Sequence, residues 1–462
     1  MTGSLRPDIC VDFARAIAET RYEKLSLEAI DAAKKSILDT LGVTLAASGL
    51  EPSVGAFVEV VSECEGKPES AVFGLGGRAP APLAALANGA MAHGLDFDDQ
   101  TPWGAHSASS IVPAVLALAE RKGGISGKRL IAAVAAGQDL FVRLRCNVGW
   151  TQDWNMSTMA GVFSAAASAS CVMDFGHEKV AHALGIAGQQ SSGTMQLIFG
   201  RGSNLRGVYA GFTAQAAVLA VLLADKGITG IDGLFEGKAG IFSTYFGGKY
   251  DRDAMLAGLG TRYLGETTLY KAWPAVGNVH TYLHATISLM RENGLVADDI
   301  EQIRVWVGDF HQQMSYPLEE RRAPATLVDA KFSLPFCVAL VAERGHMRAS
   351  DFTPATLQDV RILAIARKVV PVDDSSFDWT LKLPDARVDI ITRDGRTLSR
   401  IGNDIPGSAE SPMTWDDLVA KFSDCAAAAA VPVPPDRIEQ AHRAIRQLEA
   451  ENDVVRLVHL LT

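Results

Sequence analysis

Apolar residues recur at spacings of three and four along most of the first 259 positions, which indicates helices packed through one face. The clearest runs are "LSLEAIDAAKKSILDTLGVTLAA", "SGKRLIAAVAAGQDLFVRLRC" and "GFTAQAAVLAVLLADKG". Their ends carry matching signals, because Ser26 and Ser126 precede two of the runs and Gly227 follows Lys226 at the end of the third. This part of the chain is therefore predicted to be all-helical.

The pattern changes between about Glu266 and Gly402. "IRVWVGDF" alternates as a strand does, and "ARVDIITRDGRTLSRI" predicts a hairpin that turns at Asp394–Gly395. Helices are expected over 280–293 and 325–342, and the segment from "MTWDDLVAKF" onward is helical again. We therefore expect a mainly α protein. A large all-helical domain takes residues 1–262 and 409–462, and a smaller α+β domain, residues 263–408, is inserted before the C-terminal helices.

Composition narrows the range of functions. The chain is 48% hydrophobic and 21% charged, as globular enzymes are, and its net charge of −10 argues against nucleic acid and anionic membranes as partners. No signal-peptide core and no run long enough to span a membrane is evident, and the six cysteines form no C-x-x-C pair. A cytoplasmic protein is expected.

Two short segments resemble cofactor motifs without fitting them. In "HEKVAH" the histidines lie five positions apart, on different faces of a helix, so one zinc ion cannot take both. "GLFEGKAG" has the wrong glycine spacing for a phosphate loop and lacks the Ser or Thr that would hold magnesium. Neither a metal nor a cofactor is expected.

The strongest local feature is "MAHGLDFDD", followed by "WGAHSASS". If residues 90–99 are helical, His93 and Asp96 are i,i+3 neighbours, as are Asp96 and Asp99, and together they line one wall of a cleft facing His106. The alternative is that the aspartates only cap helices and bind backbone amides. Clustered titratable groups mark functional sites often enough to keep both interpretations open.

Two further segments carry candidate charges. Arg201 and Arg206 lie in a glycine-rich loop before a helix, where guanidinium groups would receive a carboxylate or simply remain solvated. Lys271 and His280 bracket a Pro–Gly turn at the entry to the second domain. They would close over a ligand, or serve as a surface lysine and a packing histidine.

With these segments in view, the chain resembles the MmgE/PrpD family. "ANGAMAHGLDFDD", "HSASSIVPAVLALAE", "KAWPAVGNVH" and "DAKFSLPFCVAL" follow the family's motifs in order over nearly the whole chain. The resemblance implies a homodimeric, cofactor-independent enzyme for small di- or tricarboxylic acids, with its active site in a cleft between a helical and an α+β domain.

The resemblance also assigns roles to individual residues. Asp96, His106, Lys271 and Lys331 match family motif positions. Removal of a proton α to a carboxylate builds up negative charge, which cations must stabilise while a base and an acid move the proton. His106, Lys271 and Asp96 are thus the expected catalytic group. His93, Lys331 and the residues of the loops, Arg201, Arg206, Asn155 and Tyr209, are the expected substrate-binding group.

Four positions depart from the dehydratases and decarboxylases of the family. Asn155 and Tyr209 stand where histidines are usual, and Val276 stands where a Cys or His is usual. Arg206, in place of a lysine, cannot act as a base. Loss of the group that would protonate a leaving hydroxyl favours an isomerase, an epimerase of the iminodisuccinate type. The alternatives are a dehydratase or decarboxylase, and an inactive ligand-binding homologue.

Overall fold

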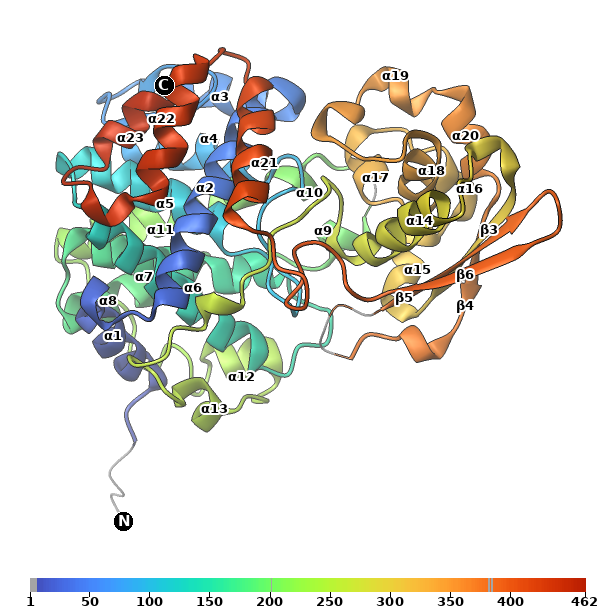
Figure 1. Cartoon of the computed structure of the whole chain (residues 1–462). Helices are drawn as coiled ribbons and strands as arrows, with labels where there is room; N and C mark the ends of the chain where they lie inside the picture. The colour runs from blue at the N-terminus through green and yellow to red at the C-terminus, as the bar shows by residue number, and fades with distance from the viewer. Residues whose placement is uncertain (1–5, 201, 381–382, 384) are drawn as a thin grey trace.

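The computed structural model describes residues 6–200, 202–380, 383 and 385–462. It has two parts of unequal size, a larger helical one and a smaller one that contains a sheet (Figure 1). The prediction of a mainly α protein with a small α+β part is confirmed.

The larger part is built from the N-terminal helices and the last three helices of the chain. Their bounds are α1 (Ile9–Glu19), α2 (Leu27–Leu50), α3 (Ser53–Glu63), α4 (Ala81–His93), α5 (Ala108–Lys122), α6 (Gly127–Cys146), α7 (Met156–Met173), α8 (His177–Ala187), α9 (Gln196–Phe199), α10 (Leu205–Val208), α11 (Ala210–Asp225), α12 (Ile241–Phe246), α13 (Arg252–Leu256), α21 (Trp415–Ala427), α22 (Pro435–Arg446) and α23 (Val455–Leu460). A small antiparallel sheet of β1 (Ser70–Ala71) and β2 (Arg78–Ala79), which the sequence did not predict, precedes α4.

The expected helix signals operate as caps. The Ser26 and Ser126 hydroxyls accept hydrogen bonds from the backbone N–H groups of Ala29 and Arg129, at 3.1 and 3.3 Å. Small residues let the core helices approach closely: a Cβ atom on Gly211 of α11 would lie 2.4 Å from the Leu86 carbonyl of α4. The tight packing of α4 fixes where its C-terminal end, and the acidic segment after it, enters the molecule.

The smaller part is a four-stranded sheet with helices packed on it. Its elements are α14 (His280–Glu292), β3 (Ile300–Val307), α15 (Asp309–Ser315), α16 (Leu318–Arg322), α17 (Leu327–Lys331), α18 (Leu334–Arg344), α19 (Pro354–Leu357), α20 (Val360–Ala366), β4 (Val369–Asp373), β5 (Ala386–Thr392) and β6 (Thr397–Gly402). The strand order is β4-β3-β5-β6, with β3 parallel to β4 and antiparallel to β5. Helices α14 and α18 pack against the sheet and against each other, over its buried Ile and Val side chains.

The strand and hairpin expected from the alternating pattern are both present. Val305 of β3 pairs with Val388 of β5, and Val388 pairs in turn with Arg400 of β6. The hairpin turns through Gly395, whose φ of +89° favours glycine.

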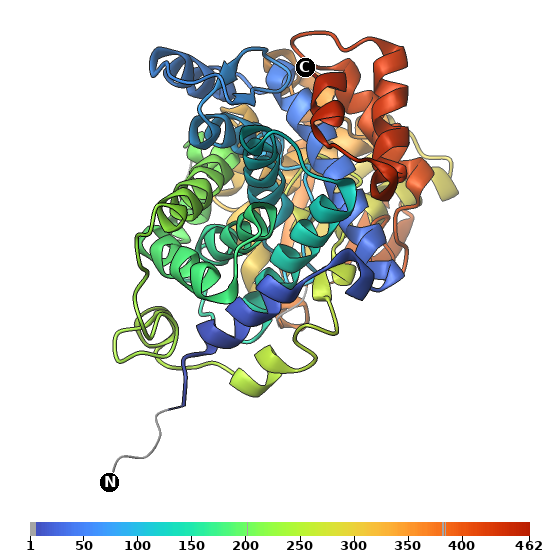
Figure 2. The same ribbon diagram turned by 90° about the vertical axis from the view of Figure 1, so that its left-hand side faces the viewer.

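The chain then returns to the larger part. Helices α21 and α22 lie beside α2 (Figures 1 and 2), and α23 packs on α22 and α5. Phe422 of α21 contacts Gly42 of α2 so closely that a Cβ atom on Gly42 would lie 3.1 Å from the Phe422 ring. Leu418, Ile445 and Leu457 join the hydrophobic core of the N-terminal helices. The smaller part has a core of its own.

Two helix predictions are wrong in detail. The helix expected over 90–99 ends at His93, because Gly94 caps α4 and the acidic residues follow in a turn. The helix expected over 325–342 is broken after Lys331, and Ser333 caps the start of α18 by accepting a hydrogen bond from the Phe336 N–H at 3.1 Å. Both breaks place candidate residues at helix ends.

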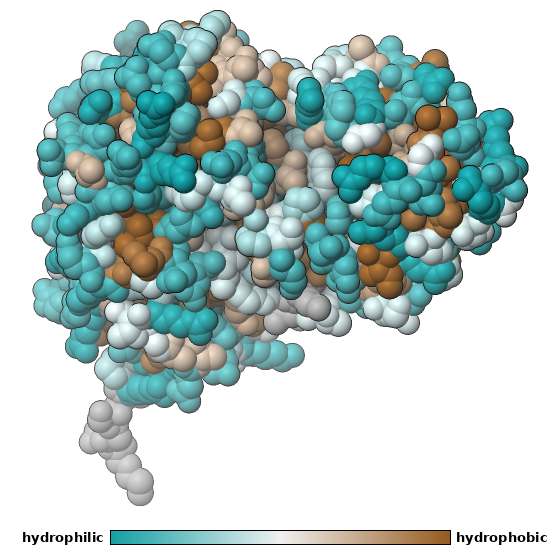
Figure 3. All heavy atoms as spheres, viewed as in Figure 1, coloured by the Kyte–Doolittle hydropathy of each residue, from teal (hydrophilic) through white to brown (hydrophobic). Residues whose placement is uncertain are grey.

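By length and composition α7 could cross a membrane, contrary to the sequence expectation, but 89% of that stretch is buried inside the protein. A core helix of a globular protein has the same composition. The face shown in Figure 3 is mostly polar, with scattered apolar residues, and it is hollowed between the two parts.

Candidate active site

A cavity of about 110 Å³ lies between the two parts and collects most of the candidate residues. The larger part contributes His93, Asp96 and His106, and the smaller part contributes Val276, Asn278, Phe310, Phe332 and Trp379. The remaining lining is Gln100, Trp103, Gly104, Ala105, Arg145, Trp150, Asn155, Met156, Ser157, Met195, Ile198, Tyr209 and Gly277. The cavity thus combines a titratable wall with a largely apolar one.

The acidic segment after α4 forms a tight loop rather than a helix. Asp96 has φ of +50° and donates its N–H to the His93 carbonyl at 2.9 Å. Ala105, across the cavity wall, has φ of +76°. Non-glycine residues rarely hold such angles unless the surroundings enforce them, and they concentrate at functional sites.

Three buried lysines from three segments fix this loop through its carbonyl groups. Lys331 donates to the Gly94 carbonyl at 3.1 Å, Lys271 to the Asp96 carbonyl at 2.8 Å and Lys421 to the Phe97 carbonyl at 2.7 Å. Each ammonium group also pairs with a carboxylate, from Glu51, Asp96 and Asp39 respectively. The lysines therefore neutralise buried acids and hold the loop in its strained conformation.

Lys271 reaches Asp96 because its segment pairs with the acidic one. Gln100 and Leu269 exchange backbone hydrogen bonds of 2.9 and 2.8 Å in an antiparallel bridge, which brings Lys271 opposite the aspartates. The turn at Gly277 packs directly on the side chain of Gln100. Glycine is needed there, because a Cβ atom at position 277 would lie 2.0 Å from the Gln100 side chain. Lys421 ties the two segments together by donating to the Lys271 carbonyl at 3.0 Å.

The two histidines share one carboxylate, that of Asp98. His93 Nδ1 lies 2.9 Å from Asp98 Oδ1, and His106 Nδ1 lies 2.6 Å from the Asp99 carbonyl and 3.4 Å from Asp98 Oδ2. A carbonyl only accepts, so His106 Nδ1 carries the proton and Nε2 keeps its lone pair. The sequence interpretation paired His93 with Asp96. The observed partner is Asp98, because the chain turns after His93.

Burial and neighbouring charges shift the pKa values of His106 and of the aspartates in different directions. Burial lowers the pKa of His106 from its ordinary 6.5 to about 4, so the imidazole is neutral at neutral pH. For Asp96 and Asp98, the interactions with Lys271 and with the two histidines outweigh burial and lower the pKa of both carboxyl groups. Burial beside the charges of Asp98 and Asp39 raises the pKa of Asp99 to about 8. The result is a neutral base beside two carboxylates and one ammonium group.

Asn155 and Tyr209 also line the cavity, as does Val276. Asn155 caps α7 with its side-chain oxygen, leaving its Nδ2 buried with no hydrogen-bond partner among the described residues. The Tyr209 ring lies 4.4 Å from that of His93, and burial raises the Tyr209 pKa well above its ordinary value. Three of the four positions that depart from the family pattern therefore meet in one cavity, and the fourth, Arg206, does not line it.

Other candidates lie behind the cavity wall. Arg206 is buried with its guanidinium carbon 3.4 Å from the centre of the Phe332 ring, and Lys331 is occupied by Glu51 and Gly94. Lys271 faces Asp96 rather than the cavity, and His280 hydrogen-bonds the Ala275 carbonyl. Arg201 lies outside the described residues.

His93, Asp98 and His106 are also spaced as metal ligands, with candidate atoms within 4.8 Å of one another. Both imidazole Nδ1 atoms already make hydrogen bonds, to Asp98 and to the Asp99 carbonyl. A cation here would have to displace those bonds and would lie close to the Lys271 ammonium. We therefore treat the group as a hydrogen-bonded acid–base cluster.

Sequence reasoning missed three residues of the site. Asp98 was overlooked because only the helical spacing of Asp96 and Asp99 was weighed. Lys421 lies far away in the sequence, in a helix that carries ordinary amphipathic signals. Arg145 ends α6 in "VRLRC", where a basic residue in the last turn is common and reveals nothing about a ligand.

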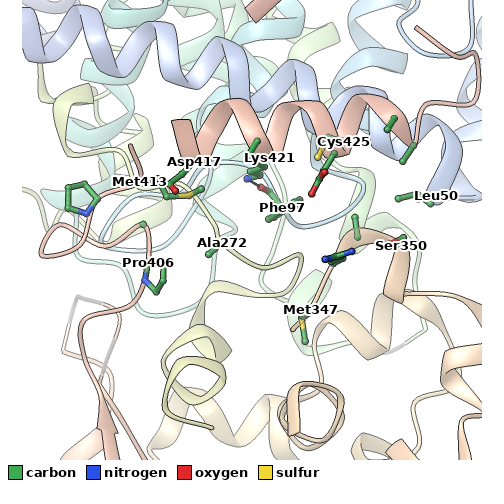
Figure 4. Close-up of a pocket in the computed structure, with 18 of the residues that line it drawn as sticks. Leu50, Phe97, Ala272, Met347, Ser350, Pro406, Met413, Asp417, Lys421 and Cys425 are labelled. Carbon is green, nitrogen blue, oxygen red and sulfur yellow. Dashed lines mark hydrogen bonds between the residues drawn. The ribbon is translucent and has the colours of Figure 1, made fainter. Parts of the chain in front are cut away.

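A second, larger cavity of about 540 Å³ lies against the outer side of the same loop (Figure 4). Phe97 and Lys421 line it, with Ala272 and Met347 opposite α21. Its most buried charge, Lys421, is saturated by Asp39 and two carbonyls, and Asp417 accepts from Thr414. The groups suited to acid–base chemistry therefore belong to the smaller cavity.

Comparison with characterised proteins gives relatives over the full chain. A cis-aconitate decarboxylase-like protein, oryM, of Aspergillus oryzae is 23% identical over 100% of this chain and 98% of its own length. Cis-aconitate decarboxylase of Aspergillus terreus is 25% identical over 94% of this chain and 92% of its own length. A mitochondrial 2-methylcitrate dehydratase of Yarrowia lipolytica is 24% identical over 88% of this chain and 81% of its own length.

These relatives correct the expected enzyme class. Decarboxylases and dehydratases are lyases, whereas the sequence departures favoured an isomerase of the epimerase type. The prediction of an isomerase is wrong. The alternative, a lyase, has the better support.

Sequence models of two successive domains cover most of the chain. The MmgE/PrpD N-terminal domain matches residues 11–253, and the MmgE/PrpD C-terminal domain matches residues 273–447. The motif resemblance, the helical and α+β parts and the cavity between them agree with these matches. The chain belongs to the MmgE/PrpD family.

Proposed function

We propose that the protein is a lyase that removes carbon dioxide from a small unsaturated tricarboxylate of the cis-aconitate type. The observation that carries this proposal is the neutral His106 imidazole, held by its Nδ1 and with its Nε2 lone pair available, on the wall of the cavity beside the Asp96–Lys271 pair. The relatives named cis-aconitate decarboxylase, which align over most of their length, support the same reaction.

In a decarboxylation the bond between a carbon atom and its carboxylate breaks, and the electron pair stays on the substrate. The negative charge spreads onto a remaining carboxylate, and a proton then adds to carbon. The site must therefore stabilise a developing anion and move one proton. Lys271 supplies buried positive charge next to Asp96. His106 Nε2 takes a proton from water and delivers it to carbon, which returns the imidazole to its neutral form, and the hydroxide left behind combines with carbon dioxide to give bicarbonate.

This reaction does not depend on an acid that protonates a leaving group. Carbon dioxide leaves as a neutral molecule and needs no acid to protonate it, whereas a leaving hydroxyl does. Asn155 and Val276, which cannot donate a proton to a leaving hydroxyl, are therefore no obstacle to loss of carbon dioxide. The same departures that favoured an epimerase are therefore compatible with a decarboxylase.

The apolar wall favours the same step. Met156, Met195, Ile198, Phe310 and Phe332 line the cavity and form its apolar side. A carboxylate held there loses solvation, whereas the transition state, in which the charge is spread over several atoms, loses less. Electrostatic contacts inside the cavity are also stronger than in water.

Dehydration of a 2-methylcitrate-type hydroxy acid is the second candidate. Here a base takes the proton α to a carboxylate, the carbon–oxygen bond breaks, and an alkene and water form. Tyr209 is the observation in its favour, because a phenol whose pKa burial raises stays protonated and lies beside His93. The relatives named 2-methylcitrate dehydratase are consistent with it.

The test is to incubate the purified protein separately with cis-aconitate, citrate and 2-methylcitrate and to follow each by ¹³C NMR. Release of bicarbonate from cis-aconitate is the expected result. Formation of an alkene from a hydroxy acid without bicarbonate would replace the decarboxylase by the dehydratase. No conversion of any compound would contradict both and favour an inactive binding protein.

The pH dependence of turnover follows from His106. Because its pKa is lowered to about 4, the neutral base persists well below pH 6.5, and kcat/KM is expected to fall only near pH 4. The same shift costs stability in acid. Between pH 6.5 and pH 4 the His106 imidazole is protonated in the unfolded chain but neutral in the folded chain. The free energy of unfolding therefore falls as the pH decreases from 6.5 toward 4. A loss of kcat/KM centred near pH 6.5 would contradict the assignment.

A further inference from the structure

Among the residues that the structure describes, Arg145 is the buried cation of the cavity that no acid neutralises. It is 2% exposed, and its Nη2 donates to the Trp103 carbonyl. Its Nε and Nη1 have no hydrogen-bond partner within the described part of the chain. Burying a guanidinium group with unmet donors costs free energy, so such groups in native proteins call for an explanation.

Arg143, two residues earlier in α6 and also buried, shows what a structural arginine looks like in this helix. Its Nε binds Asp139 at 2.8 Å, and its Nη atoms donate to the carbonyls of Met255, Ala257 and Arg262 at 2.7 to 2.9 Å. Arg143 is thus fully paired inside the protein. Arg145 is held by a hydrogen bond at one nitrogen, and its side chain lines the cavity.

Aromatic rings fix the orientation of Arg145. Its guanidinium carbon lies 4.6 Å from the centre of the Trp150 ring. The Trp150 and Trp379 rings pack edge to face, with their centres 6.2 Å apart. Trp379 in turn packs 5.2 Å from Phe310 of the smaller part. A guanidinium backed by an aromatic face keeps its edge donors free for a planar anion. The surrounding rings exclude water and strengthen the attraction.

We propose that Arg145 is a carboxylate receptor of the substrate cavity, which binds a substrate carboxylate that does not react. The proposal rests on the proposed function for the identity of the substrate, because a tricarboxylate has carboxylates to spare for such a contact. With one carboxylate on Arg145, the reacting carbon is placed toward His106. The residue selects polycarboxylates over acids that carry a single carboxylate.

The receptor differs from Arg206, which the sequence favoured for this role. Arg206 is also buried with unmet donors at Nε and Nη1, but it packs behind Phe332 and is absent from the cavity lining. Arg145 meets both conditions for contact with a ligand, unpaired donors and a place on the cavity wall. Both guanidinium groups stay charged at neutral pH, since burial lowers the pKa of Arg145 only to about 10 and that of Arg206 only to about 9.

Binding of propane-1,2,3-tricarboxylate tests the proposal without turnover, because this compound has no hydroxyl to lose and no double bond. Isothermal titration calorimetry compares the wild-type protein with Arg145→Met, Arg145→Lys and the neighbouring control Cys146→Ala. We expect Arg145→Met to weaken binding about 10- to 100-fold, as loss of a charge-assisted hydrogen bond does. Arg145→Lys should be intermediate, because lysine can neither stack nor bind in a bidentate manner. Cys146→Ala should match the wild type.

Binding by Arg145→Met within threefold of the wild type, or no binding by the wild type, would overturn the proposal. Should Arg145→Met fail to fold, tryptophan fluorescence of the wild type supplies the second measurement. The ligand should change the emission of Trp150, and Trp150→Phe should remove that change. An unaltered signal in Trp150→Phe would again contradict the proposal.

The outcome is separable from that of the proposed function. Tight binding that depends on Arg145, together with no conversion of cis-aconitate or 2-methylcitrate, would refute the lyase and leave the receptor in place. Conversion of cis-aconitate, together with unchanged binding by Arg145→Met, would support the lyase and refute the carboxylate receptor.

Discussion

Replacing His106 by asparagine is expected to lower kcat about 100- to 10,000-fold, the usual range for a lost proton-transfer group. The asparagine side-chain amide can donate to the Asp99 carbonyl in place of Nδ1, which lies 2.6 Å from that oxygen. The variant therefore keeps the local hydrogen bond while it removes the lone pair of Nε2. Steady-state kinetics with the substrate identified by NMR gives the ratio of kcat values.

Thermal unfolding of the same variant separates chemistry from folding. A melting temperature close to that of the wild type with a large loss of kcat supports the proton-transfer role. Retention of a tenth or more of the wild-type kcat would show that another group moves the proton.

Replacing Lys271 by methionine is expected to damage both stability and turnover. Its ammonium group is fully buried and pairs with Asp96, itself 2% exposed. Removing one partner of a buried ion pair typically costs about 3–5 kcal/mol, because the other charge remains without compensation. Chemical denaturation at neutral pH measures this loss.

The double variant Lys271→Met with Asp96→Asn distinguishes the two roles of the lysine. Asparagine has no charge and tolerates the positive φ of +50° at position 96, so most of the stability should return. Turnover should stay lost, because the positive charge beside the reaction centre is still missing. Recovery of kcat together with stability would show that Lys271 serves the fold alone.

The sequence predicted the fold class well because the helices and the hairpin are encoded locally. Ser26, Ser126 and Gly227 cap or terminate helices where the pattern placed them, and the Asp394–Gly395 turn forms the expected hairpin. These features depend on neighbours within a few residues. Local chemistry is therefore sufficient to infer them.

The geometry of the acidic segment could not be inferred in the same way. A helical continuation of α4 would satisfy the propensity of "NGAMAHGLDF", but Gly94 ends the helix and Asp96 adopts a strained conformation. Lysines at positions 271, 331 and 421 stabilise that conformation through carbonyl contacts. No pattern along the chain shows that three such distant residues converge.

The error in enzyme class has a chemical origin. Replacing ionisable groups by Asn155, Tyr209 and Val276 was interpreted as loss of the acid that assists a leaving group. Decarboxylation needs no such acid, so the absence of one does not distinguish an isomerase from a decarboxylase. The relatives, which are named as decarboxylases and dehydratases, favour a lyase over an isomerase.

The most direct test of the central claim is incubation of the wild-type protein with carboxyl-¹³C cis-aconitate in deuterium oxide, followed by NMR. We predict labelled bicarbonate and, in equal amount, a product with one new carbon–deuterium bond, and neither with His106→Asn. Deuterium in recovered substrate without bicarbonate or any other loss from the molecule would show that the site only exchanges a proton, and would contradict the account.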